Sequence, residues 1–175
     1  MNACRAFFQD SPQIYIPKVF NEICSDRICC MEFIHGIKVS DVRSLRSRGF
    51  DTKEVAALCV EAFAKMIFQA PFLHVDPHPG NMLVRALPDS QSNQHHRHRN
   101  ECSPQLVLLD HGMYNYIQEG FGSFMQDLWL SMVKQDKERV YLLCSQYGME
   151  RFSQLLSLAF TGRSLNSMNK YVMII

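Results

Sequence analysis

Two stretches, HVDPHPGNMLVR at residues 74–85 and LVLLDHG at residues 106–112, decide how this chain is interpreted. The first places Asp76 and Asn81 on a loop that two prolines stiffen, just before a short apolar run. The second is an apolar run that ends on Asp110. Apolar runs of this length, bounded by turn residues, predict two short strands. If the strands are neighbours, Asn81 and Asp110 lie on opposing backbone segments of one cleft.

Carboxylate and amide oxygens held in this way suit Mg²⁺, which keeps several waters and shares its other positions with phosphate oxygens. We therefore predict Asn81 and Asp110 as metal ligands. Asp76 would face the same cleft without binding the metal, where it can accept or orient a hydroxyl proton, and it is the predicted catalytic base. An aspartate among prolines is, taken alone, a turn former. The combined spacing of all three residues favours the functional interpretation.

The pattern D-x-x-x-x-N, followed by two strands and D-x-G, is typical of the catalytic loop and the metal-binding aspartate of kinase folds. In this chain, DPHPGN spans residues 76–81 and LLDHG spans residues 108–112. Together these motifs resemble the UbiB-type atypical kinases, also called aarF-domain-containing kinases. The resemblance implies Mg²⁺ and ATP as cofactors. It also implies a mitochondrial setting and a role in lipid or ubiquinone-related metabolism.

Upstream of these motifs, RICCMEFIHGIKVSD at residues 27–41 is similar to the last small-lobe strand and the hinge of that family. The resemblance implies that Met31 guards the adenine pocket. It further implies that the Glu32 carbonyl and the Ile34 amide face the adenine base. These three residues are the expected nucleotide-binding residues of the chain.

The expected fold is α+β and protein-kinase-like, with hinge-side strands of the small lobe followed by a mainly helical large lobe. Residues 1–12 would be a fragment of the small lobe, residues 13–36 its last strands and the hinge, and residues 37–175 the large lobe. Residues 86–104 are polar and unpatterned, which predicts a mobile insertion in the large lobe. The family's phosphate-covering loop and ATP-binding lysine would precede residue 13. We therefore expect this chain alone to be weak or inactive as an enzyme.

Local patterns predict the individual elements. Alternation predicts a strand over residues 13–20, and a turn at Ser25–Asp26 predicts a hairpin whose second run is Ile28–Ile34. Ser40 is a good N-cap for a short helix, and Gly49 suits its left-handed end. A longer helix should begin after Asp51, which can cap it, and end before Pro71. Apolar residues repeat along it at three-and-four spacing and predict one packed side: Val55, Leu58, Cys59, Ala62, Phe63, Met66 and Ile67. Four further helices are predicted at 118–135, 137–147, 150–160 and 165–175.

Composition excludes several classes of function. The net charge is +1 and the basic residues are scattered, so nucleic acid is not an expected partner. The seven cysteines are odd in number and lack C-x-x-C spacing, which favours a reducing compartment without disulfides. The histidine-rich tract at residues 95–99 is interpreted as a solvated loop rather than a metal site.

The expected partners are a nucleotide and a lipid or membrane-associated small molecule, because few residues separate Gly112 from the next predicted helix. That leaves little room for a peptide platform. Val75 stands where many protein kinases carry an arginine that reads a phosphorylated activation segment, so control by that route is not expected. Two alternatives stay open. One is a non-catalytic kinase-like interaction or regulatory protein, and the other is a small-molecule phosphotransferase of the aminoglycoside or choline kinase type.

Overall fold

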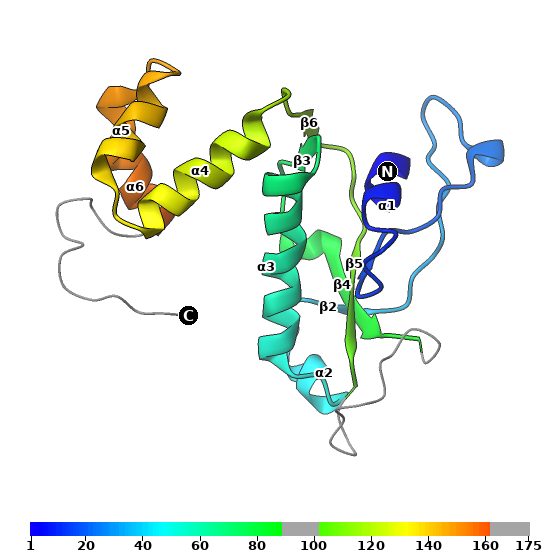
Figure 1. Ribbon diagram of the computed structural model, residues 1–175. Coiled ribbons are helices and arrows are strands. Elements are labelled where there is room, and N and C mark those ends of the chain that lie inside the picture. Colours follow the sequence, from blue (N-terminus) through cyan, green and yellow to red (C-terminus); the bar gives the residue numbers. More distant parts are fainter. Residues whose placement is uncertain (89–101, 162–175) are drawn as a thin grey trace. The chain divides into compact units, whose positions relative to one another are not determined.

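The computed structural model describes residues 1–88 and 102–161 (Figure 1). The chain divides into two compact units, the first of residues 1–116 and the second beginning at Ile117. The predicted α+β class is confirmed, because the first unit combines helices with short strands while the second is helical. The first unit contains α1 (Asn2–Phe7), β1 (Ile14–Tyr15), η1 (Asn21–Ile23), β2 (Ile37–Lys38), α2 (Val42–Ser47), α3 (Thr52–Gln69), β3 (Phe72–His74), η2 (Pro79–Asn81), β4 (Met82–Ala86), β5 (Pro104–Leu108) and β6 (Tyr114–Tyr116).

The main sheet has the strand order β1-β5-β4-β2. Strands β4 and β5 form an antiparallel hairpin in which Met82 lies opposite Leu108, and β1 pairs with β5 in parallel. All five residues of β5 are buried, which explains why its sequence is a continuous apolar run rather than an alternating one. Strands β3 and β6 form a separate antiparallel pair. In the sequence, β3 precedes the loop that carries Asp76 and Asn81, and β6 follows the segment that carries Asp110.

The core of the first unit lies between the sheet and α3, which runs beside β4 and β5 in Figure 1. Leu58, Ala62 and Met66 of α3 belong to the same buried cluster as Leu106 and Leu108 of β5. Helix α1 with its C-cap Phe8, strand β1 and strand β3 contribute further members to this cluster: Cys4, Phe8, Ile14 and Phe72. The spacing of apolar residues along 51–70 thus predicted the packed side of α3 correctly.

The predicted helix caps are partly correct. Asp51 caps α3 by accepting a hydrogen bond from the Lys53 amide at 2.9 Å, as expected. The prediction for α2 is wrong by one residue, because Asp41 rather than Ser40 is the N-cap and accepts from the Ser44 amide at 3.1 Å. The aspartate side chain reaches the amide three residues ahead, whereas the backbone of Ser40 still belongs to the turn that follows β2.

Replacing Asp41 with alanine is expected to lower the melting temperature by about 2 to 4 °C, because one amide of the first helical turn loses its acceptor. Ser40→Ala is the matched control, and it should leave the melting temperature within about 1 °C because Ser40 is exposed and caps nothing. Thermal unfolding followed by circular dichroism measures both. An equal loss in the two variants would contradict the assignment of Asp41 as the cap.

The predicted hairpin is present, but it is irregular. The strand predicted at residues 13–20 is reduced to Ile14–Tyr15. Beyond it, the chain pairs with the segment Ile28–Ile34 through isolated backbone hydrogen bonds rather than a continuous ladder. The Glu32 amide donates to the Lys18 carbonyl at 2.8 Å, and the Phe20 amide donates to the Cys30 carbonyl at 2.9 Å. The short helix η1 interrupts the ladder before the turn.

Strand β5 begins earlier than predicted, at Pro104, and ends at Leu108, so Asp110 lies two residues beyond the strand. The hairpin ladder also extends past Ala86, since the Leu87 amide donates to the Ser103 carbonyl at 2.9 Å. Residues 86–87 and 103–104, at the two ends of the predicted insertion, therefore continue the hairpin. The histidine-rich tract at 95–99 lies outside the described residues.

The second unit contains α4 (Phe121–Val133), α5 (Lys137–Ser145), η5 (Glu150–Phe152) and α6 (Ser153–Thr161). Helices α4 and α5 match the predictions at 118–135 and 137–147 with shorter bounds. The helix predicted at 150–160 begins as η5 and continues as α6 to Thr161, and the fourth, at 165–175, lies outside the described residues. Gln135 adopts a left-handed conformation with φ of 61°, and Asp136 then caps α5 by accepting from the Arg139 amide at 2.9 Å. These two residues turn the chain between α4 and α5.

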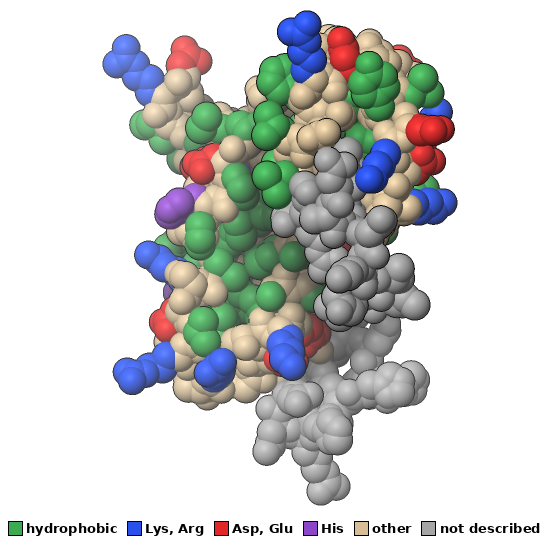
Figure 2. All heavy atoms as spheres, turned by 90° about the vertical axis from the view of Figure 1, so that its left-hand side faces the viewer, with side chains coloured by type: hydrophobic (Ala, Val, Ile, Leu, Met, Phe, Trp, Pro, Cys, Tyr) green, Lys and Arg blue, Asp and Glu red, His purple; other side chains and the backbone are tan. Residues whose placement is uncertain are grey.

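Hydrophobic side chains reach the surface of the molecule, as the green spheres in Figure 2 show. In the second unit, Leu128, Met132 and Val140 are buried between the helices. Several other large apolar side chains of α4, α5 and α6 remain exposed, namely Leu130, Val133, Tyr141, Leu142, Leu155 and Leu158. None of the described helices is both long enough and apolar enough to cross a membrane.

Candidate functional site

The loop between β3 and β4 is held by hydrogen bonds to two histidine side chains. Nδ1 of His74 accepts from the Asp76 amide at 3.2 Å, and Nδ1 of His78 accepts from the Gly80 amide at 3.0 Å. The backbone adds bonds from the His78 amide to the Asp76 carbonyl at 2.7 Å and from the Asn81 amide to the His78 carbonyl at 2.9 Å. Both histidines therefore act as structural acceptors that shape the loop carrying Asp76 and Asn81.

The structure brings the two predicted metal ligands together. The Asn81 side-chain amide donates to Oδ2 of Asp110 at 3.3 Å, and the Leu109 amide donates to the Asn81 carbonyl at 2.9 Å. Oδ1 of Asp110 accepts from the Gly112 amide at 2.8 Å. A Cβ at position 112 would lie 3.1 Å from this oxygen, so the close turn favours glycine there. The carboxylate and the amide are thus fixed side by side at the end of the β4–β5 hairpin.

This donor set fits a magnesium ion. One carboxylate and one amide oxygen are hard ligands, and Mg²⁺ commonly takes only one or two protein groups, leaving its other positions to water and phosphate. No cluster of three or more histidine, cysteine, aspartate or glutamate side chains that could hold a metal occurs within residues 1–88 and 102–161. A transition-metal site built from those side chains is therefore not found in the described part of the chain.

Asp76, the predicted base, is half-buried on the same loop, five residues before Asn81. Among the described side chains, its carboxylate makes no hydrogen bond to Asn81 or Asp110. The loop hydrogen bonds fix its backbone relative to the two ligands, since they tie His74 to Asp76 and His78 to Asn81. Its assignment as the base stays a prediction.

A cavity of about 870 Å³ contains the other predicted site residues. Met31, Glu32 and Ile34 of the hairpin segment line it, together with Asp110 and Gly112. Its remaining lining residues are Met1, Cys29, Phe33, Leu83, Leu109 and His111. The volume suits a nucleotide-sized ligand. One cavity is therefore lined both by the residues predicted to face adenine and by one predicted metal ligand, Asp110. Asp76 and Asn81 are not part of its lining.

The predicted hinge side of this cavity has two backbone groups that could bond a ligand. Within the described residues, neither the Glu32 carbonyl nor the Ile34 amide has a backbone hydrogen-bond partner. Ile34 is buried, with 7% of its surface exposed, and buried amides are normally paired. An adenine edge offers an acceptor and a donor for this pair of groups. The arrangement supports the roles expected for Glu32 and Ile34 without testing them.

The side chain of Glu32 has a structural role that sequence reasoning missed. Its Oε2 accepts from the Tyr15 hydroxyl at 2.6 Å and from the Lys18 amide at 3.1 Å. Burial alone would raise the pKa of Glu32, but these two bonds and nearby arginines outweigh it and hold the pKa below its usual value. Because Tyr15 lies far from Glu32 in the sequence, no local pattern indicated the bond between them. The charged carboxylate ties the hairpin segment to β1.

His111 packs against Tyr114. Its ring stacks on Tyr114 with centroids 5.5 Å apart and planes 6° from parallel, and its Nε2 lies 3.0 Å from the Leu108 carbonyl. Its Nδ1 contacts the Tyr114 hydroxyl. Burial is the main cause that lowers the pKa of His111 to about 4, so the ring is neutral at neutral pH. Burial likewise raises the pKa of Tyr114 above its usual value. The residue beside Asp110 thus adds no positive charge to the site.

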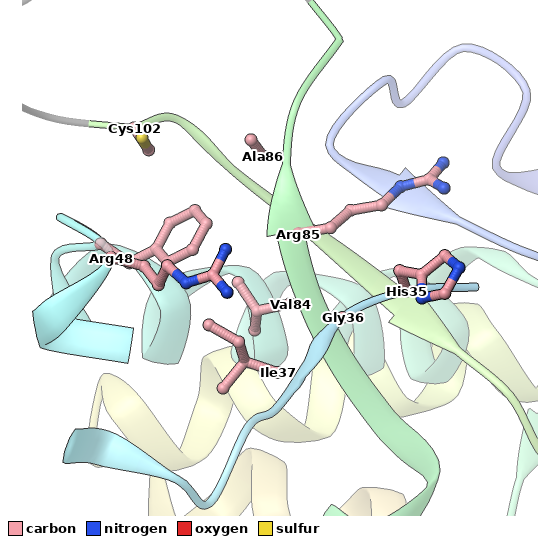
Figure 3. A pocket seen from close by; sticks show the side chains of 9 residues that line it. His35, Gly36, Ile37, Arg48, Val84, Arg85, Ala86 and Cys102 are labelled. Carbon is pink, nitrogen blue, oxygen red and sulfur yellow. The ribbon is translucent and has the colours of Figure 1, made fainter. Parts of the chain in front are cut away.

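A second cavity, of about 470 Å³, is lined by residues of β2, β4 and the segment after α2, as Figure 3 shows. Arg48 and Arg85 both line it, but their guanidinium groups do not converge in Figure 3. Arg85 instead donates to Oε1 of Gln105 at 2.7 Å and stacks 4.3 Å from the centre of the Tyr15 ring. The cavity contains none of the predicted site residues.

Some lining residues of the larger cavity were not predicted from the sequence. Cys29, Met31 and Phe33 alternate along one extended segment, so they share a face. That periodicity was a usable signal for Cys29 and Phe33. From the sequence, Leu83 and Leu109 would be interpreted only as core residues. Nothing in their local sequence indicates that the two arms of the β4–β5 hairpin border a cavity.

Comparison with known proteins gives the following similarities. The family model described as "ABC1 atypical kinase-like domain" matches residues 1–143. AarF domain-containing protein kinase 1 of Xenopus laevis is 32% identical over 155 residues, which cover 89% of this chain and 28% of that protein. The probable serine/threonine-protein kinase abkD of Dictyostelium discoideum is 40% identical over 142 residues, covering 81% of this chain and 18% of that protein.

AarF domain-containing kinase 1 of Drosophila melanogaster is 32% identical over 143 residues, which cover 82% of this chain and 25% of that protein. The chain thus spans less than a third of the length of these curated relatives. The matches agree with the resemblance inferred from the DPHPGN and LLDHG motifs.

Proposed function

Because this chain belongs to the ABC1 atypical kinase-like family, also known as the AarF-domain kinases, we propose that it binds Mg²⁺-ATP and contributes to phosphoryl transfer or ATP hydrolysis. The observation that carries the proposal is the 870 Å³ cavity, whose lining combines the hinge residues Met31, Glu32 and Ile34 with Asp110. In a kinase fold, the adenine base and the metal-bound phosphates occupy opposite ends of one such cleft.

On the adenine side, we assign the Glu32 carbonyl and the Ile34 amide as the groups that bond the base. The cavity is bordered here by apolar side chains, of which Met31 and Leu83 would contact the faces of the ring. Burying an aromatic base against such side chains contributes much of the binding, while the two backbone groups fix its orientation. Residues 13–36 would therefore serve as the last small-lobe strands and the hinge.

On the phosphate side, we assign Asn81 and Asp110 as the groups that hold Mg²⁺. When bound, the ion neutralises phosphate charge that the chain's own carboxylates would otherwise repel. Asp110 supplies the charged oxygen, and Asn81 supplies a neutral oxygen whose position is set by the bond to Asp110. Asp76 would accept or orient the proton of the attacking hydroxyl or water. Histidine does not compete for this proton, because His74 and His78 already accept backbone amides.

We further propose that the acceptor is a small molecule from lipid or ubiquinone-related metabolism, or water, and that the setting is mitochondrial. The family resemblance implies both. The short connection between Gly112 and α4 supports a small acceptor, because only residues 113–120 are available to hold a substrate peptide there.

Blocking the cavity tests the nucleotide site directly. Met31→Trp places a large ring at the predicted gatekeeper, and it should weaken binding of Mg²⁺ and a non-hydrolysable ATP analogue by roughly tenfold or more in calorimetry. Ile28→Trp is the matched control, because Ile28 is exposed near the tip of the same hairpin and does not line the cavity. An equal loss of affinity in both variants, or no loss in Met31→Trp, would show that the nucleotide does not bind in this cavity.

A further inference from the structure

The tip of the hairpin places two cysteines opposite each other. Ser25 and Ile28 exchange two backbone hydrogen bonds, the Ser25 amide donating at 2.9 Å and the Ile28 amide at 3.3 Å. They are therefore a hydrogen-bonded antiparallel pair. The same register, continued one residue outward from the turn, makes Cys24 and Cys29 the facing residues of a pair that shares no backbone bonds. Facing Cα atoms at such a position are about 4.5 Å apart.

Facing residues of an antiparallel pair point to the same side of a hairpin, so the register makes the Cys24 and Cys29 side chains neighbours. The sulfur of Cys24 accepts from the Cys30 amide at 3.3 Å, so it lies over the backbone between Cys29 and Cys30. Cys29 is exposed and Cys24 is half-buried, which leaves the pair open to a reagent in solution.

Cys30 follows Cys29 directly but faces the other way. Its thiol donates to the Ile23 carbonyl at 3.2 Å, on the opposite arm of the hairpin. Adjacent residues of an extended segment point to opposite faces, which agrees with this separation. Cys30 is therefore a close neighbour of the pair that is not aligned with it, and it provides a natural control.

We propose that Cys24 and Cys29 form an oxidisable dithiol that closes to a cross-strand disulfide when it meets a low-molecular-weight disulfide such as oxidised glutathione. Cα separations of about 4.4 to 6.8 Å accommodate a disulfide, and the spacing of a facing pair without backbone bonds falls at the lower end of that range. This modification site revises the expectation, drawn from the number and spacing of the cysteines, of a chain without disulfides.

The reaction balances as two thiol–disulfide exchanges. One cysteine thiolate attacks a sulfur of the small disulfide, forming a mixed disulfide and releasing one small thiolate. The facing cysteine, as its thiolate, then attacks the protein sulfur of the mixed disulfide and expels the second small thiolate. The protein loses two thiol protons and two electrons, and the small disulfide is reduced to two thiols. No metal or further oxidant is needed.

The site borders the larger cavity without depending on what the cavity binds. Cys29 lines the cavity and Cys24 does not, so the disulfide would fix one wall residue to the opposite arm of the hairpin. The chemistry of the dithiol stands on the hairpin register alone. Its test therefore needs no nucleotide, and its failure would leave the proposed function untouched.

Trypsin offers a direct readout, because Arg27 lies between the two cysteines. Cleavage after Lys18, Arg27 and Lys38 puts Cys24 on peptide 19–27 and Cys29 on peptide 28–38. The folded 175-residue chain is incubated with oxidised glutathione, free thiols are blocked with N-ethylmaleimide at acidic pH, and the digest is examined by mass spectrometry. The expected product is a linked pair of these peptides, lighter by two hydrogens and separated by a reductant.

Variants identify the sulfur atoms involved. Cys30→Ser should retain the linked pair, whereas Cys29→Ser should reduce its yield roughly tenfold or more, because only Cys29 faces Cys24. Unfolding the chain in guanidinium before oxidation should scramble the linkage between Cys29 and Cys30. The proposal is overturned if the folded chain gives no linked pair, if Cys29→Ser retains it, or if linkage between two copies of the chain dominates at low protein concentration.

Discussion

Asp110→Ala is expected to weaken Mg²⁺-dependent nucleotide binding by roughly a hundredfold or more, the largest binding effect predicted for a single side chain here. Asp110 is the one predicted ligand that is both charged and part of the cavity lining. Removing it leaves Asn81 without the carboxylate to which its side-chain amide donates. Calorimetric titration with a non-hydrolysable ATP analogue, with and without Mg²⁺, measures the change.

Glu61→Ala is the matched control for charge, since Glu61 is an exposed carboxylate of α3 whose partner is Lys65 at 2.7 Å. A surface pair of this kind contributes little to stability, so the control should bind as the parent does. The Mg²⁺ dependence of nucleotide affinity is the result that tests Asp110 as a metal ligand. Asp110→Ala should bind with the same weak affinity whether or not the metal is present, and a retained difference would show that another group holds the ion.

Asp76→Asn is expected to reduce turnover of ATP by roughly a hundredfold to ten-thousandfold, the range usual for loss of a general base. Asparagine keeps the size of the side chain but cannot accept a proton, so nucleotide affinity should stay within about threefold of the parent. Because the chain spans less than a third of its relatives, the assay is run on this chain and on a version extended at its N-terminus with the matching region of a relative.

The contrast between binding and turnover separates Asp76 from the predicted ligands. Asn81→Ala should impair both, because it removes a group that we assign to the metal. Asp76→Asn should impair turnover alone. If Asp76→Asn instead lost nucleotide affinity in proportion to its activity, Asp76 would belong with the metal ligands, and the base would have to be sought elsewhere on the loop.

The sequence predicted those features that depend on short patterns. The spacing of apolar residues located α3 and its buried side, and the Asp51 cap marked its start, because both signals lie within a few residues. The turn at Ser25–Asp26 was found for the same reason. The motif spacing likewise placed Asn81 and Asp110 on adjacent strand ends, and the structure joins them by a hydrogen bond.

The sequence failed where an element depends on distant partners. Strand β2 and the β3–β6 pair are only two or three residues long, and no local pattern distinguishes them from loops. The parallel pairing of Ile14 with Leu106 joins residues far apart in the chain, so the extent of β1 cannot be read from the local alternation that predicted a strand at 13–20. Similarly, the bond between Tyr15 and Glu32 arises only once the hairpin is folded against β1.

The register of the β4–β5 hairpin has an evolutionary consequence. Met82 lies opposite Leu108, and the Leu109 amide bonds the Asn81 carbonyl, so the ladder itself sets the spacing between the two predicted ligands. Side chains of the two strands can therefore change between lineages, as long as the register is kept, while Asn81 and Asp110 keep their relative positions.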